Sequence, residues 1–401
     1  MNILLINHYA GSPEHGMEFR PYYIAREINN TGNKCFIVAA DHSHLRKITT
    51  LSGYDNIDGV DYLWLKTKKY EGNGSGRVLN IFSFLYQLYK KANEIIKWSK
   101  PDIVIASSTY PLDNYLAHYI AKKCNAKVIY EVHDLWPLSP MEIGGLSKWH
   151  PFIMLLQMAE NYGLKNCHQL ISMLPNTLPH MIEHGLDNSK FNYIPNGIDL
   201  SNCIIEELSE MHTLTMEKLK AKNQSIVGYA GGHAESNCLD LLIDAATLLP
   251  NVQFVLLGDG IEKARLINSV STKGLKNVTF LPPVSKNVVQ SFLSYCDILT
   301  LVWHDLPLYK FGVSPNKIFD YMLAKKPIVQ ALTSENDPVT LANAGITIET
   351  GNPKLLSEAY ERILQLSDFE RNRLGDNGYN YVINNHSYSY LSNKFIEVCK
   401  K

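Results

Sequence analysis

Residues 225–233 read Ser-Ile-Val-Gly-Tyr-Ala-Gly-Gly-His, and residues 239–246 read Leu-Asp-Leu-Leu-Ile-Asp-Ala-Ala. The first stretch is a short apolar run bounded by glycines, which is typical of a buried strand. The second has the composition of a helix start. A strand joined to a helix by a short glycine-rich turn is the repeating unit of a parallel sheet covered by helices. The stretch therefore predicts an α/β fold.

The same alternation extends in both directions from this unit. Strands are expected before it at 3–6, 35–40, 62–65, 103–106, 127–130 and 169–172, and after it at 252–257, 278–281, 298–302, 327–330 and 345–348. A sharp turn at Ile194-Pro-Asn-Gly-Ile-Asp199 separates the two series. We expect two Rossmann-like, doubly wound domains, residues 1–195 and 196–384, that face each other across a cleft. A last helix of about 385–401 should pack back on the first domain.

The composition of the chain excludes several classes of protein. The chain has 401 residues, 45% of them hydrophobic and 19% charged, so two ordered domains are expected. A formal net charge of -1 gives no basic field for nucleic acid. The seven cysteines show no C-x-x-C spacing, which argues against a structural zinc site and a disulfide framework. The sequence shows no signal peptide and no run of roughly 20 apolar residues, so a cytoplasmic protein that touches a membrane without crossing it is expected.

Two glycine-rich turns follow strands of the second domain. Gly231, Gly232 and His233 end the first of these strands, and Gly258 and Gly260 end the next. Such turns can bring backbone N–H groups against a phosphate at a helix N-terminus. Each turn alone is weak evidence, because tight turns also use glycine for shape.

A more specific signal lies at Phe311-Gly-Val-Ser-Pro-Asn-Lys-Ile-Phe-Asp320. Ser314 is the expected N-cap of a helix. Lys317 would lie in the first turn, where a cation opposes the helix dipole, so its presence indicates an external anion. Asp320 lies on the same helix face, three residues later. We expect Lys317 to face a diphosphate and Asp320 to face ribose hydroxyls, the alternative being a solvated Lys–Asp pair.

Polar residues also follow strands of the first domain. The loop after the first strand offers Gly11, Glu14, His15 and Gly16, and Arg20 begins the next helix. His133 and Asp134 end the strand at 127–130. Because the carboxyl ends of parallel strands share one edge of a sheet, we expect these residues to face the cleft and bind an acceptor. The alternative for His133 is a histidine with internal partners that closes a turn before Trp136-Pro137.

Residues 78–98 suggest a helix that is apolar on more than one side. Val78, Phe82, Leu85, Tyr89, Ala92 and Ile96 form the expected core stripe, and Phe84, Leu88 and Ile95 widen it. Lys90, Lys91 and Lys97 border it, and Lys66-Thr-Lys-Lys69 lies nearby in sequence. The helix is either a buried domain helix with a solvated lysine edge or a surface that rests on anionic lipid.

Taken together, these motifs resemble glycosyltransferase family 4, whose members are retaining enzymes of the GT-B fold. The resemblance rests on the glycine-bearing first loop, Glu131-Val-His-Asp134, Ile194-Pro-Asn-Gly-Ile-Asp199, Gly258-Asp-Gly260 and the helix that ends in Asp320-Tyr-Met-Leu-Ala. The family's E-x7-E motif is half missing, because its first glutamate falls on Gly312. The family's lysine in the first glycine loop falls on Asn237. Details such as Ser314-Pro-Asn-Lys317 are most similar to N-acetyl-L-fucosaminyltransferases of O-antigen and capsule assembly.

The resemblance implies a donor and an acceptor. A UDP-sugar would bind the second domain, with uracil near Pro283 and Val284 and the rest against Asn237 and residues 312–316, which are Gly312, Val313, Ser314, Pro315 and Asn316. His133, Lys317 and Asp320 would carry catalysis, with front-face attack by the acceptor hydroxyl. The acceptor would be a polyprenyl-diphosphate-linked saccharide at the anionic inner leaflet of the membrane. No D-x-D triplet occurs, so neither a metal nor any other cofactor is expected, and Lys317 with helix N-termini would stabilise the leaving diphosphate.

Two other functions remain open from the residues alone. A UDP-sugar 2-epimerase shares the two-domain fold and needs acid/base carboxylates with a histidine, which His133 and Asp134 leave possible. A homologue that binds a nucleotide sugar without catalysis is suggested by the missing glutamate at Gly312. A dehydrogenase is disfavoured, because no G-x-G-x-x-G opens the first helix of either domain.

Overall fold

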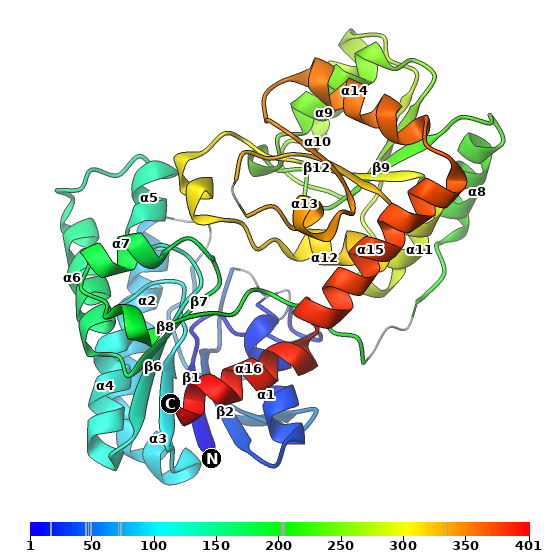
Figure 1. Ribbon diagram of the computed structural model, residues 1–401. Helices are drawn as coiled ribbons and strands as arrows, with labels where there is room; N and C mark the ends of the chain where they lie inside the picture. Colours follow the sequence, from blue (N-terminus) through cyan, green and yellow to red (C-terminus); the bar gives the residue numbers. More distant parts are fainter. Residues whose placement is uncertain are drawn as a thin grey trace. The chain divides into compact units, whose positions relative to one another are not determined.

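The computed structural model describes all residues except Met17, Leu45, Lys47, Thr49, Glu71, Asn73, Asn202, Cys203, Ile204 and Glu335. The chain divides into two compact units, each described here by itself (Figure 1). The first unit comprises Met1–Asn196 and Tyr388–Lys401, and the second unit comprises Gly197–Ser387.

An eight-stranded sheet forms the centre of the first unit. Its strands are β1 (Asn2–Ile6), β2 (Lys34–Ala40), β3 (Gly53–Ile57), β4 (Val60–Leu65), β5 (Ile103–Ala106), β6 (Lys127–Val132), β7 (Gln169–Ser172) and β8 (Phe191–Tyr193). They lie in the order β3-β4-β2-β1-β5-β6-β7-β8. All neighbours are parallel except β3, which pairs antiparallel with β4.

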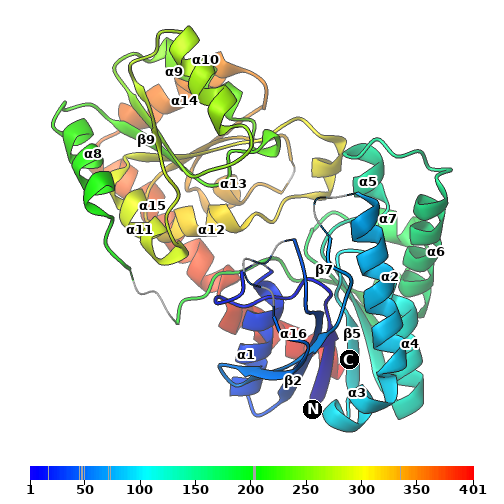
Figure 2. The same ribbon diagram turned by 180° about the vertical axis from the view of Figure 1, so that it is seen from behind.

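Helices cover both faces of this sheet. They are α1 (Arg20–Asn30), α2 (Ser75–Lys90), α3 (Ala92–Ser99), α4 (Asp113–Cys124), α5 (Leu138–Glu142), α6 (Pro151–Asn166), α7 (Leu178–Glu183), a 3-10 turn η1 (Asn188–Lys190) and α16 (Tyr388–Lys400). On one face α16 packs against α1, with the rings of Tyr23 and Tyr388 stacked at 4.8 Å. Alternate residues of β1, Ile3 and Leu5, share a buried cluster with Leu391 and Phe395 of α16. On the other face α4 packs between α2 and α6 (Figure 2).

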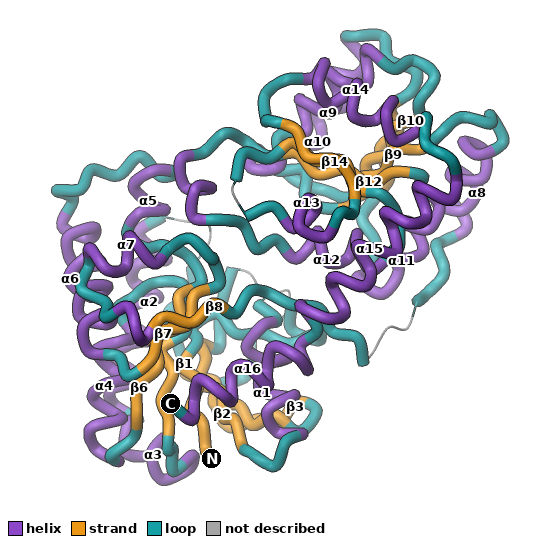
Figure 3. Tube along the Cα trace, viewed as in Figure 1, coloured by secondary structure: helices purple, strands orange, loops and turns teal. Residues whose placement is uncertain are grey.

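A six-stranded parallel sheet forms the centre of the second unit (Figure 3). Its strands are β9 (Ile226–Ala230), β10 (Gln253–Leu257), β11 (Val278–Leu281), β12 (Ile298–Val302), β13 (Ile328–Ala331) and β14 (Gly345–Ile348), in the order β11-β10-β9-β12-β13-β14. Its helical segments are α8 (Glu210–Lys220), η2 (Glu235–Asn237), α9 (Leu239–Leu248), α10 (Lys263–Thr272), α11 (Lys286–Tyr295), η3 (Pro307–Phe311), α12 (Asn316–Leu323), α13 (Pro338–Ala342), α14 (Pro353–Leu364) and α15 (Asp368–His386).

Both sheets reverse their strand order at one point. In the first unit the reversal falls between β1 and β5, and in the second between β9 and β12. The carboxyl ends of the strands at such a switch point are where open α/β sheets bind ligands. The α/β doubly wound fold predicted for both domains is therefore confirmed.

One predicted helix differs in the structure. Residues 78–98 form α2 and α3, which meet at Lys91. Of the predicted core stripe only Ala92 is buried, whereas Phe84, Leu88 and Ile95, predicted to widen it, are all buried. The buried side chains of α2 include Ile81, Phe84 and Leu88, whereas Phe82 is 43% exposed and Tyr89 is 57% exposed. Within the described residues, no helix is both long and apolar enough to cross a membrane.

Candidate functional site

The two glycine-rich turns of the second unit pack against each other. A Cβ on Gly258 would lie 1.9 Å from the carbonyl oxygen of Gly231, and one on Gly260 would lie 2.2 Å from that of His233. Both positions also have positive φ, +146° and +159°, which L side chains rarely adopt. Glycine is therefore required here by the close approach of the two chain segments.

This packing uses N–H groups that we expected to face a phosphate. Gly231 donates to the carbonyl of Leu257 at 2.9 Å, His233 to that of Asp259 at 2.7 Å, and Gly258 to that of Leu281 at 3.1 Å. The prediction of bare N–H groups at these three positions is wrong, because carbonyls of the neighbouring turn and of the ends of β10 and β11 accept from them. Gly232 has no such crowding, since the nearest atom to its Cβ would lie 3.8 Å away on Asn237.

Lys317 is the cation that the structure brings to the end of β9. It lies in the first turn of α12, and its Nζ donates to the hydroxyl of Tyr229 at 2.9 Å and to Oδ1 of Asn237. The ammonium also lies 5.1 Å from the centre of the Tyr229 ring. No carboxylate of the described residues forms an ion pair with it. Burial lowers the pKa of Lys317 to about 8, because desolvation disfavours its charged form.

The turn before α12 differs from the expectation. Pro315, not Ser314, occupies the N-cap position, and the helix begins at Asn316 without a side-chain cap. Proline there has an extended backbone, with ψ at 133°, and supplies no capping oxygen. Gly312 has a φ of +100°, and Val313 is buried while Asn316 is exposed. The first turn of α12 therefore keeps backbone N–H groups without a side-chain acceptor.

Asp320 has a partner other than Lys317. Its carboxylate pairs with Nζ of Lys286, the first residue of α11, and the side chain of Asp320 is only 13% exposed. The local Lys317–Asp320 pair, which was the alternative interpretation, is not formed. Pro283 and Val284 lie in the loop between β11 and α11, just before Lys286.

His233 is fully buried, and neither of its ring nitrogens has a hydrogen-bond partner among the described residues. Its ring packs edge-on against Phe280 at 5.8 Å. Burial and the nearby Lys263 lower its pKa to about 4, so the imidazole is neutral. A neutral, buried ring fits a packing role here.

In the first unit, a buried cluster of charges joins α1 to β6. The Nε of Arg20 donates to Oε1 of Glu131 at 2.9 Å, and its terminal nitrogens donate to the carbonyls of Ile194 and Pro195. Arg20 is 3% exposed. Arg20 is predicted to bind the acceptor, but internal partners occupy its guanidinium in this structure.

His133 extends the same cluster. Its Nδ1 lies 3.1 Å from Oε1 of Glu18, and its Nε2 lies 2.9 Å from Oγ of Ser107 and 3.3 Å from Oε2 of Glu131. Burial alone would lower the pKa of His133, but Glu18 and Glu131 raise it to about 10. Arg20 and His133 in turn hold the pKa of Glu131 well below its usual range despite its burial. His133 is thus an imidazolium with internal partners at both nitrogens, and it positions Glu18.

The other residues expected in the first unit lie around this cluster. Glu14 and Asp134 are exposed, and His15 is half-buried with its Nδ1 2.7 Å from Oγ of Ser12. Gly11 is fixed by its N–H to the carbonyl of Glu18 at 2.9 Å, and Gly16 has a φ of +97°. The loop after β1 is therefore tied to Glu18, just before α1, with Glu14 exposed, and Asp134 is exposed after β6.

Several residues of the site were missed as candidates: Glu18, Ser107, Glu131, Tyr229 and Lys286. Glu131 carried a signal, since a carboxylate inside the apolar run of β6 must find a buried partner. Lys286 and Tyr229 carried none, because only the folded sheet brings them beside α12.

Two family models match the chain, one to each half. The model described as Glycosyltransferase Family 4 matches residues 15–202, and that described as Glycosyl transferases group 1 matches residues 213–381. The first match ends at residue 202 and the second begins at residue 213, close to the start of the second unit at Gly197. Both halves thus match models of the same class of transferase.

Similar individual proteins agree with this assignment of fold. The chain is 23% identical over 225 residues to the putative colanic acid biosynthesis glycosyl transferase WcaI of Escherichia coli K12, covering 55% of each, so the match spans about half the length of that relative. Sucrose-phosphate synthase from Thermosynechococcus elongatus superposes with a TM-score of 0.76 at 14% identity, over 100% of this chain and 98% of that one. HepE of Anabaena in complex with UDP-glucose superposes with a TM-score of 0.68 at 14% identity, over 100% of both chains. These likenesses confirm the predicted GT-B fold.

Proposed function

Because the chain belongs to glycosyltransferase family 4, we propose that it transfers a sugar from a UDP-sugar to a lipid-linked saccharide in bacterial surface-polysaccharide synthesis. The transfer would retain the anomeric configuration of the sugar. The sugar we favour is an N-acetylated aminosugar such as N-acetyl-L-fucosamine, and the acceptor is a saccharide on polyprenyl diphosphate. The WcaI relative, named for colanic acid biosynthesis, supports the polysaccharide context.

One observation carries the proposal. Lys317 is a desolvated ammonium at a helix N-terminus, and its partners are the neutral oxygens of Tyr229 and Asn237. The helix dipole disfavours a cation at that end, and burial disfavours its charge further. A bound diphosphate would relieve both costs, because it supplies the missing counter-charge and accepts from the free N–H groups of α12. Asp320, held by Lys286, would then accept from ribose hydroxyls.

Uridine is the base that we propose for the donor. HepE, which shares the fold, has been solved with UDP and with UDP-glucose. In this chain the loop at Pro283 and Val284 follows β11 and precedes Lys286, the partner of Asp320. Backbone groups of that loop would read the edge of uracil.

The test is a donor panel. UDP should raise the melting temperature of the purified chain more than GDP or ADP does, because a ligand that binds only the folded state stabilises it. Incubation with UDP-sugars should then show slow donor hydrolysis. Interconversion of UDP-sugars would identify an epimerase, and binding without turnover would identify a non-catalytic homologue.

We also propose that donor cleavage needs no metal at the diphosphate. The chain has no D-x-D triplet, and Lys317 offers the positive charge that a bridging cation would otherwise supply. Turnover should persist in EDTA. Turnover that vanishes in EDTA and returns with Mg²⁺ or Mn²⁺ would refute this part of the proposal.

Finally, we propose that α2 and its lysines rest on an anionic membrane surface. Leu79, Phe82, Tyr86 and Tyr89 are 54%, 43%, 62% and 57% exposed, and their spacing puts them on one face of α2. Lys90 and Lys91 end that helix, Lys97 and Trp98 lie on α3, and Lys66, Lys68 and Lys69 are exposed nearby in sequence. Apolar side chains beside lysines suit the boundary between lipid headgroups and acyl chains. Each lysine close to such a surface contributes about 1 kcal/mol.

Liposome sedimentation tests this surface. The chain should bind vesicles with anionic lipid more than neutral ones, and salt should weaken binding. Lys90→Glu with Lys91→Glu should release the chain, whereas Lys276→Glu with Lys354→Glu in the second unit should not. Equal binding to neutral and anionic vesicles would identify the lysines as an ordinary solvated edge.

A further inference from the structure

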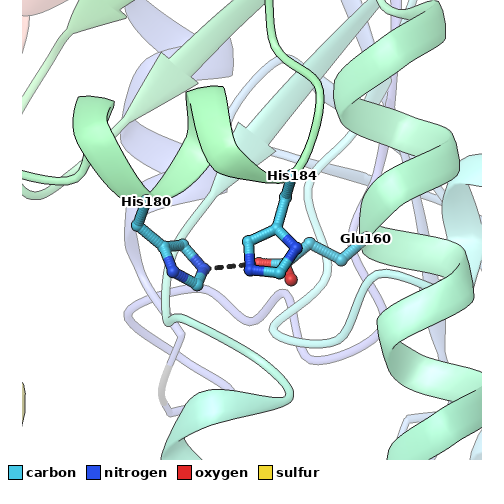
Figure 4. Close-up of side chains that lie close together, drawn as sticks. All are labelled: Glu160, His180 and His184. Atoms are coloured by element: carbon cyan, nitrogen blue, oxygen red, sulfur yellow. Dashed lines mark hydrogen bonds and ion pairs between the residues drawn. The ribbon is translucent and has the colours of Figure 1, made fainter.

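A second group of side chains in the first unit has no part in the proposed transfer. Glu160 lies on α6, His180 lies on α7, and His184 directly follows α7. The three side chains point toward one another (Figure 4). Nε2 of His180 lies 3.3 Å from Oε1 of Glu160, and the two imidazole rings have centroids 4.5 Å apart.

The donor atoms are spaced for a small divalent cation. One ligand atom from each residue can be chosen so that all three lie within 4.8 Å of one another. Ligands about 2.0–2.1 Å from a tetrahedral zinc ion lie roughly 3.3 Å apart, which is the separation already present between His180 and Glu160. Small rotations of His184 would close the remaining distance.

The chemistry of the cluster favours zinc over a hard cation. Imidazole nitrogens suit Zn²⁺ and its neighbours in the first transition row, whereas Mg²⁺ and Ca²⁺ prefer sites made of oxygen. Two histidines and one carboxylate, with a fourth position for water, form a recurrent zinc set. The lack of C-x-x-C spacing argues against a structural zinc site, but a site of two histidines and a carboxylate needs no cysteine.

Glu160 needs a positive partner. It is 3% exposed, and among the described ion pairs its partner is His180 alone, with no lysine or arginine. A buried carboxylate is costly unless a cation compensates it. A metal ion would supply two positive charges at this point.

Outer hydrogen bonds hold the candidate ligands in place. Nε2 of Gln157 donates to Oε2 of Glu160 at 2.7 Å, which leaves Oε1 to face His180. Nδ1 of His184 lies 3.0 Å from Oδ1 of Asn161 and 3.0 Å from Nε2 of Gln157, so two amides hold the ring in place. In the tautomer whose Nδ1–H donates to Asn161, Nε2 is left as the metal-binding lone pair. Such outer partners, which fix tautomer and orientation, accompany metal-binding histidines.

We propose that Glu160, His180 and His184 bind one Zn²⁺ ion, which fastens α7 to α6. The site is built from the first unit alone and is independent of the proposed sugar transfer. Its role is to hold the segment that follows β7, because α7 is only six residues long and has no side-chain cap of its own.

Zinc titration of the full chain, without a polyhistidine tag and stripped with EDTA, tests the site. In competition with a chromophoric chelator, the chain should take up one Zn²⁺ and gain in melting temperature, while Mg²⁺ should do neither. Glu160→Gln and His180→Ala should abolish uptake, and Asn161→Ala should weaken it about 10–100-fold. His304→Ala, which removes a half-buried histidine of the second unit, is the matched control and should bind zinc normally.

The alternative is a hydrogen-bonded tie between two helices. In that case Glu160→Gln would lower the melting temperature, and zinc would bind neither chain. No uptake by the unaltered chain, or uptake retained in both Glu160→Gln and His180→Ala, would overturn the proposal. Co²⁺ uptake by the unaltered chain, with the intense visible bands of a four-coordinate site, gives a readout that does not depend on whether any variant folds.

Discussion

The two units treat buried charge in opposite ways. In the first unit Arg20, Glu131, His133 and Glu18 form a closed set, in which each charge faces an opposite one or a backbone carbonyl. In the second unit Lys317 is also desolvated, yet its hydrogen-bond partners are a phenol and an amide. A closed set compensates its charges within the fold, so that loss of one member is costly, whereas an uncompensated charge costs stability until a ligand arrives. The contrast separates a structural cluster from a binding group.

The largest effect on stability should come from removing one member of the buried charge cluster in the first unit. Arg20→Met leaves Glu131 buried without its main counter-charge and removes the donor to two carbonyls. The free energy of unfolding should therefore fall by about 3–5 kcal/mol. Chemical denaturation measures this. Arg265→Met is the control, since its pairs with Asp240 and Glu262 are exposed and their loss should cost far less stability. Similar losses in the two variants would mean that the cluster of the first unit is not special.

Lys317→Ala should give the opposite pattern. Transfer should fall by roughly 10²–10³, the scale of losing one preorganised charge-stabilising group. Stability should stay unchanged or rise slightly, because an unfavourable charge at a helix N-terminus is removed. Steady-state transfer assays and thermal unfolding of the same preparation check both halves. Lys325→Ala, just beyond the other end of α12, serves as control, and a destabilised but fully active Lys317→Ala would reverse the assignment.

A smaller, pH-dependent effect should distinguish His133. Its pKa is raised above 6.5 to about 10, so the stability it contributes is fully present below pH 6.5 and is lost as pH rises toward 10. The difference in unfolding free energy between the unaltered chain and His133→Gln should therefore shrink from pH 6 to pH 10. A difference that stays constant over this range would show that the imidazolium is not stabilised by Glu18 and Glu131.

The smallest signal is the proton taken up when UDP binds. The pKa of Lys317 is about 8 without ligand, and a diphosphate beside it should raise that value. Near pH 8.5, UDP binding should therefore take up a fraction of one proton. Calorimetry in two buffers of different ionisation enthalpy measures the uptake, and Lys317→Ala should remove it. Binding without proton uptake would place the diphosphate away from Lys317.

The sequence predicts the central strands of both sheets well, because they are apolar runs buried on both faces. It does not predict β3 or β8. β3 reads Gly-Tyr-Asp-Asn-Ile and is largely exposed at a sheet edge, so it has no apolar run. β8 has only three residues and exists because β7 offers it an edge. The core stripe of α2 was displaced around the helix for a related reason: α2 is apolar on two faces, and periodicity alone cannot say which face is covered.

For the candidate site, the sequence predicts on which element a residue lies better than it predicts which residues that side chain contacts. It places Lys317 and Asp320 on one helix from local signals, but the partners of Lys317 lie 80 and 88 residues away. The sequence suggests that the glycine turns contact a phosphate. It does not show that they pack on each other, because this packing depends on two strands being neighbours in the sheet. The sequence shows that His180 and His184 are four residues apart. It does not show that Glu160 lies beside them, because Glu160 joins them only through the packing of α6 on α7.

The first unit is built from two separate stretches of the chain, and this arrangement affects its biosynthesis. Residues 388–401 lie beside β1 in the buried core, yet the ribosome makes them after the whole of residues 197–387. The second unit is continuous, so it can complete its core before the first unit receives its last helix. A nascent chain therefore carries Ile3, Leu5 and their neighbours with one face of the sheet only partly covered until residues 388–401 have been made. Ribosome-stalled chains that end before Tyr388 should be sensitive to protease in the first unit and resistant in the second.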